Sequence, residues 1–586
     1  MSALHTGGRR RGDRDIAHGA RATQCLVAAQ ALVAIASAIV LAWPSPCAAQ
    51  ALPKPGDPSP EPPPPLQVPP LQPPVLATTP AAPTPPADAA APAGPSFVLR
   101  EVRFNGASVI GQSELQALAA PQLGQLVTLR DLEAITRRVT QRYREAGYPL
   151  AQALLPAQDI KEGAVEISVL EGRVDKVRVE IDPEALVDEA TVQAFVARIP
   201  LGQPLQQDTL TRAMLLLSDL PGVKPAAAIE AGAVPGSSEL IVSIGGARRW
   251  EASFDADNHG TRSTSEYRVG TQLRWNGPLR HGDNLDLRLQ TGTKGGRNGG
   301  IVTGRLAYEH PLGGNGTRLG LAASTLQYAL GGEFADLDAT GHARVVEASL
   351  MHPLIRSRPR NLSLKATLLR KQLRDEFGIV DAKLDKHATA ASLALNFENR
   401  DELLGGGYSS AGVNLMHGRL GLGSAARALD DRRTEGSYTT LNYSLSRLQT
   451  ITPDINAYLG IAGQLANKNL DAGDKIALGG PRGVRAYAPS EATGDEGHVL
   501  NAELRWSPLQ QLSLQLFHDW GWVRHNKRPL PTDTDHRTAL RGWGIGAHWA
   551  SDFGLTLRAT LAWRGTKAGQ IDDRNPRLLF QLSYAL

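Results

Sequence analysis

Cysteine is nearly absent from this sequence. Cys25 and Cys47 are its two cysteines, and both lie in an N-terminal segment that we expect to be removed during export. A mature chain without thiols can form no disulfide, no cysteine-ligated zinc site and no thiol nucleophile. These classes of structure and chemistry are therefore excluded.

Long hydrophobic runs are missing beyond residue 43, so no segment there is predicted to cross a membrane as a helix. The formal net charge is only +4, and no run of Lys and Arg interleaved with aromatic residues occurs. This argues against nucleic acid as a partner. A transmembrane β-barrel is compatible with both absences, because its strands carry a much weaker hydrophobic signal than a membrane helix.

Recognisable catalytic motifs are also missing. The sequence has no H-E-x-x-H zinc motif and no glycine-rich phosphate loop ending in Gly-Lys-Ser/Thr. A candidate nucleophile elbow at residues 407–411 reads Gly-Tyr-Ser-Ser-Ala and lacks the second glycine. We therefore expect no enzyme, no metal site and no cofactor.

The first 49 residues have the organisation of a signal peptide. Five arginines within residues 9–21 precede an uncharged apolar stretch at 25–43, and Cys-Ala-Ala at 47–49 supplies small residues before a cleavage site. We predict that Gln50 begins the mature chain. A retained N-terminal anchor helix is the alternative.

Residues 50–95 form a proline-rich linker, because 18 of the 40 prolines lie between residues 53 and 95. Such a segment adopts extended, polyproline-like conformations and cannot bury a core. A ligand for a signalling domain is the alternative, but in an exported bacterial chain we interpret the segment as a spacer.

Two α+β modules are predicted next, at residues 96–172 and 173–246. Alternation predicts strands, and apolar residues at helical spacing predict helices, one of them capped by Thr128. The first module has strands near 97–104, 150–155 and 164–170 and helices near 112–120 and 128–146; the second has strands near 174–181, 223–230 and 239–244 and helices near 188–197 and 207–219. Two successive β-α-α-β-β units without a catalytic cluster are typical of small binding domains.

Residues 247–586 lose the helical period and alternate apolar with polar side chains in about 16 segments of roughly ten residues, such as 555–561. A soluble β-sandwich would alternate in the same way. A membrane barrel is favoured because ten residues cross a bilayer as a tilted strand, an even number of strands can close, and short and long connections alternate. Closure also leaves no unpaired strand edge in lipid.

Two stretches carry the candidate functional residues. The long loop at 466–497 contains a glycine-rich segment with Gly479, Gly480, Val484, Arg485, Ala486 and Tyr487. Along the strand at 512–522, alternation points Phe517, Asp519 and Gly521 into the lumen. A guanidinium can hold a carboxylate through two parallel hydrogen bonds, so an Arg485–Asp519 pair could lock the loop inside the barrel. The alternative is a solvated loop arginine and one lumen charge among many.

Both stretches resemble motifs of the two-partner secretion translocators, the TpsB-type transporters of haemolysins and filamentous haemagglutinins. Val-Arg-Ala-Tyr at 484–487 is similar to the family's VRG(Y/F) loop motif, with Ala486 in place of glycine, and Phe-x-Asp-x-Gly at 517–521 is similar to its inward strand motif. The two modules resemble POTRA domains. The resemblance covers residues 96–586 and implies a 16-stranded outer-membrane barrel preceded by two periplasmic POTRA-like domains, with the sixth extracellular loop folded inside and Arg485 paired with Asp519.

The function that this resemblance implies is the export of one large secreted partner, a TpsA-type exoprotein, across the outer membrane of a Gram-negative bacterium without ATP. The partner would add a strand to exposed edges of the POTRA sheets. Candidate docking residues at those edges are Leu150, Ala151, Leu154, Leu155, Ala226 and Ile229. Barrel-assembly machinery, periplasmic chaperones and outer-membrane lipid are the other expected partners. The last strand is similar to the signal that such machinery reads, although it ends in Leu586 where that signal normally has Phe or Trp.

Two other functions fit part of the pattern. A factor that inserts outer-membrane proteins belongs to the same superfamily, but such factors usually carry more than two modules. A passive porin or a barrel enzyme would have no use for periplasmic docking domains.

Overall fold

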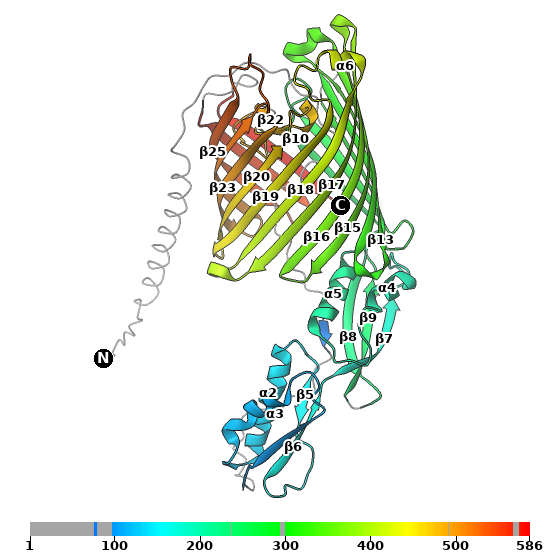
Figure 1. Cartoon of the computed structure of the whole chain (residues 1–586), viewed down its shortest axis with the longest axis vertical. Helices are drawn as coiled ribbons and strands as arrows, with labels where there is room; N and C mark the ends of the chain where they lie inside the picture. The colour runs from blue at the N-terminus through cyan, green and yellow to red at the C-terminus, as the bar shows by residue number, and fades with distance from the viewer. Residues whose placement is uncertain (1–75, 79–95, 235, 294–298, 490, 567–573) are drawn as a thin grey trace, which may run out of the picture.

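The computed structural model of the chain describes residues 76–78, 96–234, 236–293, 299–489, 491–566 and 574–586. The predicted signal peptide lies outside the described residues, as does the proline-rich linker apart from residues 76–78. Two α+β modules stand below one end of a tall barrel, and the second module lies against the barrel (Figure 1).

The first module packs two helices on a three-stranded sheet with the order β3-β6-β5. Its elements are β2 (Phe97–Val98), β3 (Glu101–Asn105), α2 (Gln112–Ala119), β4 (Leu126–Val127), α3 (Leu129–Glu145), β5 (Gln152–Leu154) and β6 (Ala164–Leu170). Helix α3 starts at a capping box, in which the carboxylate of Asp131 accepts the Thr128 backbone N–H at 2.8 Å. Leu132, Ile135 and Val139 recur at helical spacing and are buried against the sheet.

The second module repeats this architecture with β7 (Arg173–Ile181), α4 (Glu189–Val196), α5 (Gln207–Ser218), β8 (Lys224–Ala231) and β9 (Ser237–Gly245). Asp188 caps α4 by accepting the Thr191 backbone N–H at 2.7 Å. The sheet order is β1-β8-β9-β7, and β1 (Leu76–Thr78) comes from the proline-rich linker. The linker was predicted to be a spacer throughout; three of its residues instead form a strand of this sheet.

The barrel contains 16 antiparallel strands and is closed by the pairing of β10 with β27. Its strands are β10 (Trp250–Asp257), β11 (Arg268–Asn276), β12 (Asn284–Gly292), β13 (Gly300–Leu312), β14 (Thr317–Ala329), β15 (Ala339–Arg356), β16 (Arg360–Phe377), β17 (Ala382–Asp401), β18 (Gly407–Leu422), β19 (Gly436–Thr452), β20 (Ile455–Ala466), β23 (Glu496–Leu509), β24 (Leu512–Arg524), β25 (Arg537–Ala550), β26 (Leu555–Arg564) and β27 (Arg577–Ala585). Two short strands, β21 (Ile476–Ala477) and β22 (Thr493–Gly494), pair with each other outside the wall sequence. The predicted 16-stranded membrane fold is confirmed.

Strand length departs from the prediction of roughly ten residues. The wall strands range from 8 residues in β10 to 20 in β17. About 9–11 residues suffice to cross a bilayer, so the longest strands continue beyond the membrane. In Figure 1 the strands reach furthest from the modules on the side of the barrel that β16–β18 form.

The second module is fixed to the short-turn end of the barrel. Asp219, which follows α5, accepts two hydrogen bonds from Arg356 of β15, at 2.8 and 2.6 Å. Helix α4 approaches the turn between β13 and β14 so closely that a Cβ on Gly314 would lie 1.7 Å from the Ala194 carbonyl oxygen. Glycine at this turn therefore permits the docking of the module.

Candidate functional site

The connection between β20 and β23, residues 467–495, is hereafter called the inserted loop. It is the sixth connection at the end of the barrel away from the modules. Apolar residues of the loop form one buried cluster with inward-facing residues of the neighbouring strands. The cluster contains Leu478, Val484, Ala486, Tyr487 and Ala492 from the loop and Val499, Phe517, Val523, Leu540 and Ala562 from the wall. The loop therefore lies inside the barrel, against β23–β26.

Arg485 is the central polar residue of this contact. Its Nε donates to Oδ2 of Asp519 at 2.9 Å and its Nη2 to Oδ1 at 2.7 Å, while its backbone N–H donates to Oδ2 at 3.0 Å. Nη1 lies 2.7 Å from Oε1 of Glu503, and the guanidinium carbon lies 3.5 Å from the centre of the Phe517 ring. The side chain of Arg485 is 9% exposed and that of Asp519 is 0% exposed, so these charge-assisted bonds are shielded from water.

The residues that surround the Arg485 side chain are hereafter called the Arg485 cage: Asn501, Glu503, Phe517 and Asp519. Two of them, Asn501 and Glu503 on β23, were not predicted from the sequence. Asn501 donates to Oδ1 of Asp519 at 2.7 Å and to the Gly483 carbonyl at 3.1 Å, so it joins the strand to the loop. Glu503 also pairs with Arg505 at 2.7 Å, which gives the cage two cations and two anions. The signal that could have found them is register, because Asn501 pairs with Asp519 and Glu503 with Phe517 across the β23–β24 hairpin.

The residues beside Arg485 fit the wall closely. The Tyr487 hydroxyl is hydrogen-bonded to Thr566, 2.6 Å from its Oγ1 and 2.9 Å from its carbonyl oxygen. Ala486 is fully buried, and a Cβ on Gly542 of β25 would lie 2.8 Å from the Ala486 Cβ. The wall therefore provides, at Gly542, the space that the methyl group of Ala486 occupies.

The glycines of the two motifs have separate roles. Gly479 forms an isolated parallel bridge with Val484, and Gly480 has φ +99°, a conformation that glycine adopts readily. On β24, a Cβ on Gly521 would lie 3.0 Å from the Leu478 side chain. The structure thus brings together every residue that the sequence suggested for the loop and the strand motif.

The base of the inserted loop contacts a different part of the wall. The carboxylate of Asp474 lies 3.0 Å from the Lys371 ammonium on β16, and that of Asp471 lies 2.9 Å from the Lys386 ammonium on β17. Lys386 also lies 3.7 Å from Asp375. Strands β18, β19 and β20 separate these contacts from the Arg485 cage, so the loop spans two regions of the lumen.

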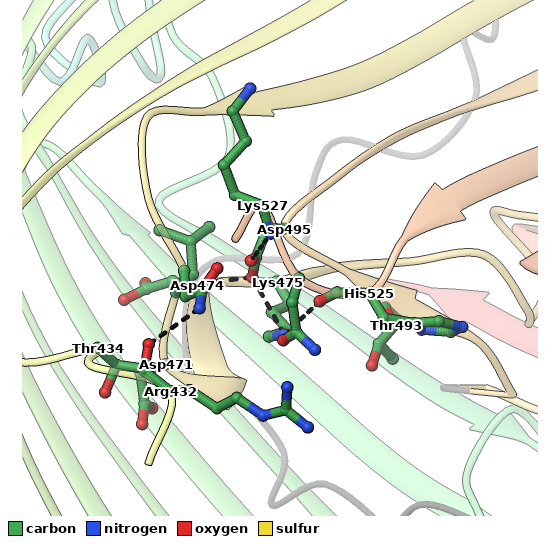
Figure 2. Close-up of polar contacts among 12 residues, drawn as sticks. Arg432, Thr434, Asp471, Asp474, Lys475, Thr493, Asp495, His525 and Lys527 are labelled. Atoms are coloured by element: carbon green, nitrogen blue, oxygen red, sulfur yellow. Dashed lines mark hydrogen bonds and ion pairs between the residues drawn. The ribbon is translucent and has the colours of Figure 1, made fainter. Parts of the chain in front are cut away.

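A second polar group joins the base to the connection between β24 and β25. Asp495 is fully buried; it accepts the backbone N–H of Lys527 at 2.7 Å and lies 3.1 Å from the Lys475 ammonium. Lys475 also donates to the His525 carbonyl at 2.5 Å. Figure 2 shows Asp471, Asp474 and Lys475 following one another along the loop, with Asp495 beside Lys475.

The predicted docking residues of the modules differ in accessibility. Strand β5 is an edge of the first sheet, and Leu154 within it is 38% exposed, whereas Ala151 is buried and Leu150 and Leu155 pack against the cores. Ala226 and Ile229 lie in β8 and are partly buried. The outer edge of β8 is paired with β1, so it is not the free edge that the sequence suggested.

In the part of the chain that the structure describes, no group of three or more His, Cys, Asp or Glu residues could hold a metal ion. No helix there combines the length and the apolar character needed to cross a membrane.

Comparison with known proteins agrees with the geometry. The model of the family described as haemolysin secretion/activation protein ShlB/FhaC/HecB matches residues 236–549, and that of the ShlB-type POTRA domain matches residues 97–172. The heme/hemopexin transporter protein HuxB of Haemophilus influenzae is 28% identical over 77% of this chain and 80% of that protein. The outer membrane transporter CdiB of Dickeya dadantii is 24% identical over 80% of this chain and 83% of that protein.

A solved structure shares the fold. CdiB from Escherichia coli superposes with a TM-score of 0.67 at 20% identity, over 86% of this chain and 92% of that one. The chain therefore belongs to the ShlB/FhaC/HecB family of haemolysin secretion/activation proteins, outer-membrane β-barrel transporters of two-partner secretion whose N-terminal POTRA domains lie in the periplasm.

Proposed function

We propose that this chain recognises one large, TpsA-type exoprotein in the periplasm, exports it through the barrel without ATP, and gates the barrel with the inserted loop. The observation that carries the proposal is the cage around Arg485. A buried guanidinium held by two carboxylates keeps a long loop inside the lumen, where it obstructs the path that an exported polypeptide would take.

Recognition would use the POTRA sheets. An unfolded segment of the exoprotein adds a strand to a sheet edge and gains main-chain hydrogen bonds with little demand on its sequence. Strand β5 offers such an edge in the first module, and Leu154 within it is exposed. Because the second module contacts the barrel through Asp219 and Arg356, a chain bound to the modules is held close to the periplasmic opening.

Gating would require the loop to leave its cage. Arg485 has discrete partners in the inserted state, so the loop is a two-state element rather than a continuously deformable one. The absence of a phosphate-loop motif in the sequence supports export without ATP. During biogenesis, periplasmic chaperones and the barrel-assembly machinery would deliver the chain to outer-membrane lipid. Phe580 and Leu582 on the exposed face of β27 would support recognition by that machinery.

The test compares secreted proteins in the source bacterium with and without the gene. Mass spectrometry of the culture medium should show one very large protein lost on disruption and restored by the wild-type gene. Arg485→Ala should fail to restore it, although the barrel still folds, as judged by heat-modifiable migration on gels. Arg370→Ala, at an exposed arginine of the wall strand β16, is the matched control and should restore secretion.

The two parts of the proposal fail in different ways. If no secreted protein depends on the gene, the export function is wrong. If Arg485→Ala secretes the exoprotein at the wild-type rate, export stands and the gating role of the loop is wrong.

A further inference from the structure

The outward face of β25 carries two arginines among its apolar side chains. Leu540 is buried against the inserted loop and Gly542 lies beside Ala486, so these two residues of β25 face the lumen. Because side chains alternate along a strand, Arg537, Arg541 and Trp543 are on the opposite, outer surface. Trp543 is 47% exposed, which agrees with this placement. Strands β23 and β25 lie on one side of the barrel, with β24 between them (Figure 1).

Aromatic side chains on the same surface mark the level of the outer membrane–water interface. The ring centre of His498 lies 5.3 Å from that of Trp520 and 4.9 Å from that of Trp522. Trp543 stacks on a second indole, on β26, with 4.7 Å between the ring centres. Tryptophan gathers at the headgroup level of a membrane, in girdles around a barrel. Arg541 pairs in register with Trp520, so it lies between the levels of Trp522 and Trp543.

The strands around these arginines offer them no anion. Strands β24, β25 and β26 contain a single acidic residue, Asp519, which belongs to the Arg485 cage in the lumen. Arg537 lies over the Trp522 ring, with its guanidinium carbon 5.6 Å from the ring centre. The Nε of Arg541 is buried and has no hydrogen-bond partner among the described residues. A cation at this depth is costly unless an anion compensates it, so the anion must come from outside the chain.

The phosphate of an outer-leaflet lipid is the anion available at this level. The outer leaflet of a Gram-negative outer membrane consists of lipopolysaccharide, whose lipid A part carries phosphorylated sugars above several acyl chains. A guanidinium binds phosphate through two parallel hydrogen bonds. Arg537 and Arg541 are four residues apart, about 13 Å along the strand, so one headgroup with two phosphates could reach both. Further from the outer end, Leu516, Ile545 and Leu557 are exposed and offer an apolar surface to the acyl chains.

We propose that the outward face of β24–β26, at the outer end of the barrel, is a binding site for lipid A. Arg537 and Arg541 bind its phosphates, and the tryptophans pack against its sugars and the upper part of its acyl chains. The order of cations, indoles and aliphatic side chains along this surface matches the order of phosphates, sugars and acyl chains in the lipid. The site is independent of the proposed export function, because it lies on the outside of the wall and needs no exoprotein.

Binding is measured on the full-length protein, purified in detergent and washed free of lipopolysaccharide. The probe is purified lipid A with two phosphates. It is titrated while the unfolding temperature of the barrel is followed by heat-modifiable migration on gels. We expect a saturating amount to raise this temperature by about 5 °C. The same lipid after removal of its phosphates, and inorganic phosphate alone, should each raise it by less than about 1 °C.

Two double variants separate these arginines from the general charge of the barrel. Arg537→Gln with Arg541→Gln should raise the dissociation constant for lipid A at least about tenfold. Arg374→Gln with Arg427→Gln is the matched control, because it removes the same charge from exposed arginines at the same end of the barrel. Each of these two already pairs with a carboxylate of the protein. The control should bind lipid A as the wild type does.

A third variant covers the case in which the glutamine pair does not fold. Arg537→Lys with Arg541→Lys keeps both charges and should bind lipid A about threefold more weakly than the wild type, since an ammonium group serves phosphate only as a point charge. Binding of this variant at the wild-type affinity would contradict bidentate recognition of phosphate by the two arginines.

Three results would overturn the site. Equal protection by lipid A and by its dephosphorylated form would show that the surface binds acyl chains alone. Equal protection by inorganic phosphate would show an anion site that does not recognise a lipid. Equal weakening in the glutamine pair and in its matched control would make the effect one of net charge.

Discussion

The inserted loop is held by ion pairs at two places, one fully buried and one largely buried, and the two differ in their chemistry. At the tip of the loop, the guanidinium of Arg485 contacts the carboxylates of Asp519 and Glu503. It also lies over the aromatic ring of Phe517. At the base, two ammonium groups pair with separate carboxylates, Lys371 with Asp474 and Lys386 with Asp471. The tip contacts β23 and β24, whereas the base contacts β16 and β17.

The contact at the tip has a fixed geometry, whereas the pairs at the base depend mainly on the attraction of opposite charges. Guanidinium presents donors in a planar fork, so the bidentate contact of Arg485 with Asp519 fixes both position and angle. An ammonium group is a compact point charge on a flexible stem, so a Lys–Asp pair tolerates displacement. We therefore expect the tip to depend on the identity of its cation, and the base to depend on charge alone.

Among changes that keep the charge or the packing residues of the loop, the largest effect is expected from Arg485→Lys. Lysine retains the charge but cannot serve Asp519 bidentately and reach Glu503 as well. Removing one partner of a buried ion pair altogether costs about 3–5 kcal/mol, and this is the upper limit for a lysine that compensates the carboxylates only in part. Export should fall by more than about tenfold, and channel currents in planar bilayers should show frequent openings. Wild-type export by this variant would mean that charge alone holds the tip.

A smaller loss of export is expected from Gly542→Ala, because the added methyl group would clash with the inserted loop at Ala486. The new Cβ would lie 2.8 Å from the Ala486 Cβ, so the loop must shift although every charge is retained. Overpacking of this kind costs about 1–3 kcal/mol, and export should fall several-fold. Adding Ala486→Gly removes the opposing methyl group and should restore export. Without such rescue, the effect of Gly542→Ala would have to arise elsewhere in β25.

Much of this arrangement could be predicted from the sequence. The strand expected at 164–170 is β6, and the helix expected at 207–219 is α5, Gln207–Ser218. Alternation along 512–522 put Asp519 on the inner face because the side-chain period of a strand is two. The glycine-rich segment then suggested Arg485 as the cation that pairs with the carboxylate of Asp519.

The remaining features depend on distances that a sequence does not encode locally. Glu503 reaches Arg485 through a hairpin register that shifts between Trp506 and Leu509, and such a bulge has no reliable sequence signal. Asp474 and Lys371 are 103 residues apart, and each is one charge among many on its segment. Pairing of β1 with β8 was hidden because the surrounding prolines indicate a spacer.

The base is expected to tolerate a change of cation that the tip does not. Lys371→Arg with Lys386→Arg should export at the wild-type rate, since both charges remain. Lys371→Gln with Lys386→Gln leaves two carboxylates without their cations, and channel openings should become about threefold more frequent while export changes little. Equal behaviour of the Arg and Gln variants in bilayer recordings would contradict a role for charge at the base.

The smallest effect is expected from lowering the pH, which protonates the carboxylate of Asp471. Burial raises the pKa of Asp471, but the nearby Lys386 ammonium and hydrogen bonds outweigh burial and hold the pKa below its ordinary value. A carboxyl group with a depressed pKa stabilises the folded contact above its unfolded pKa, near about 4, and this contribution is lost as the pH falls through the lower folded value. Channel openings should therefore be constant between about pH 8 and 5 and rise about twofold below about pH 4. Asp471→Asn should show the higher frequency of opening at every pH, because residue 471 then has no carboxylate to titrate. If the response to acid persists unchanged in this variant, another group is responsible for the titration.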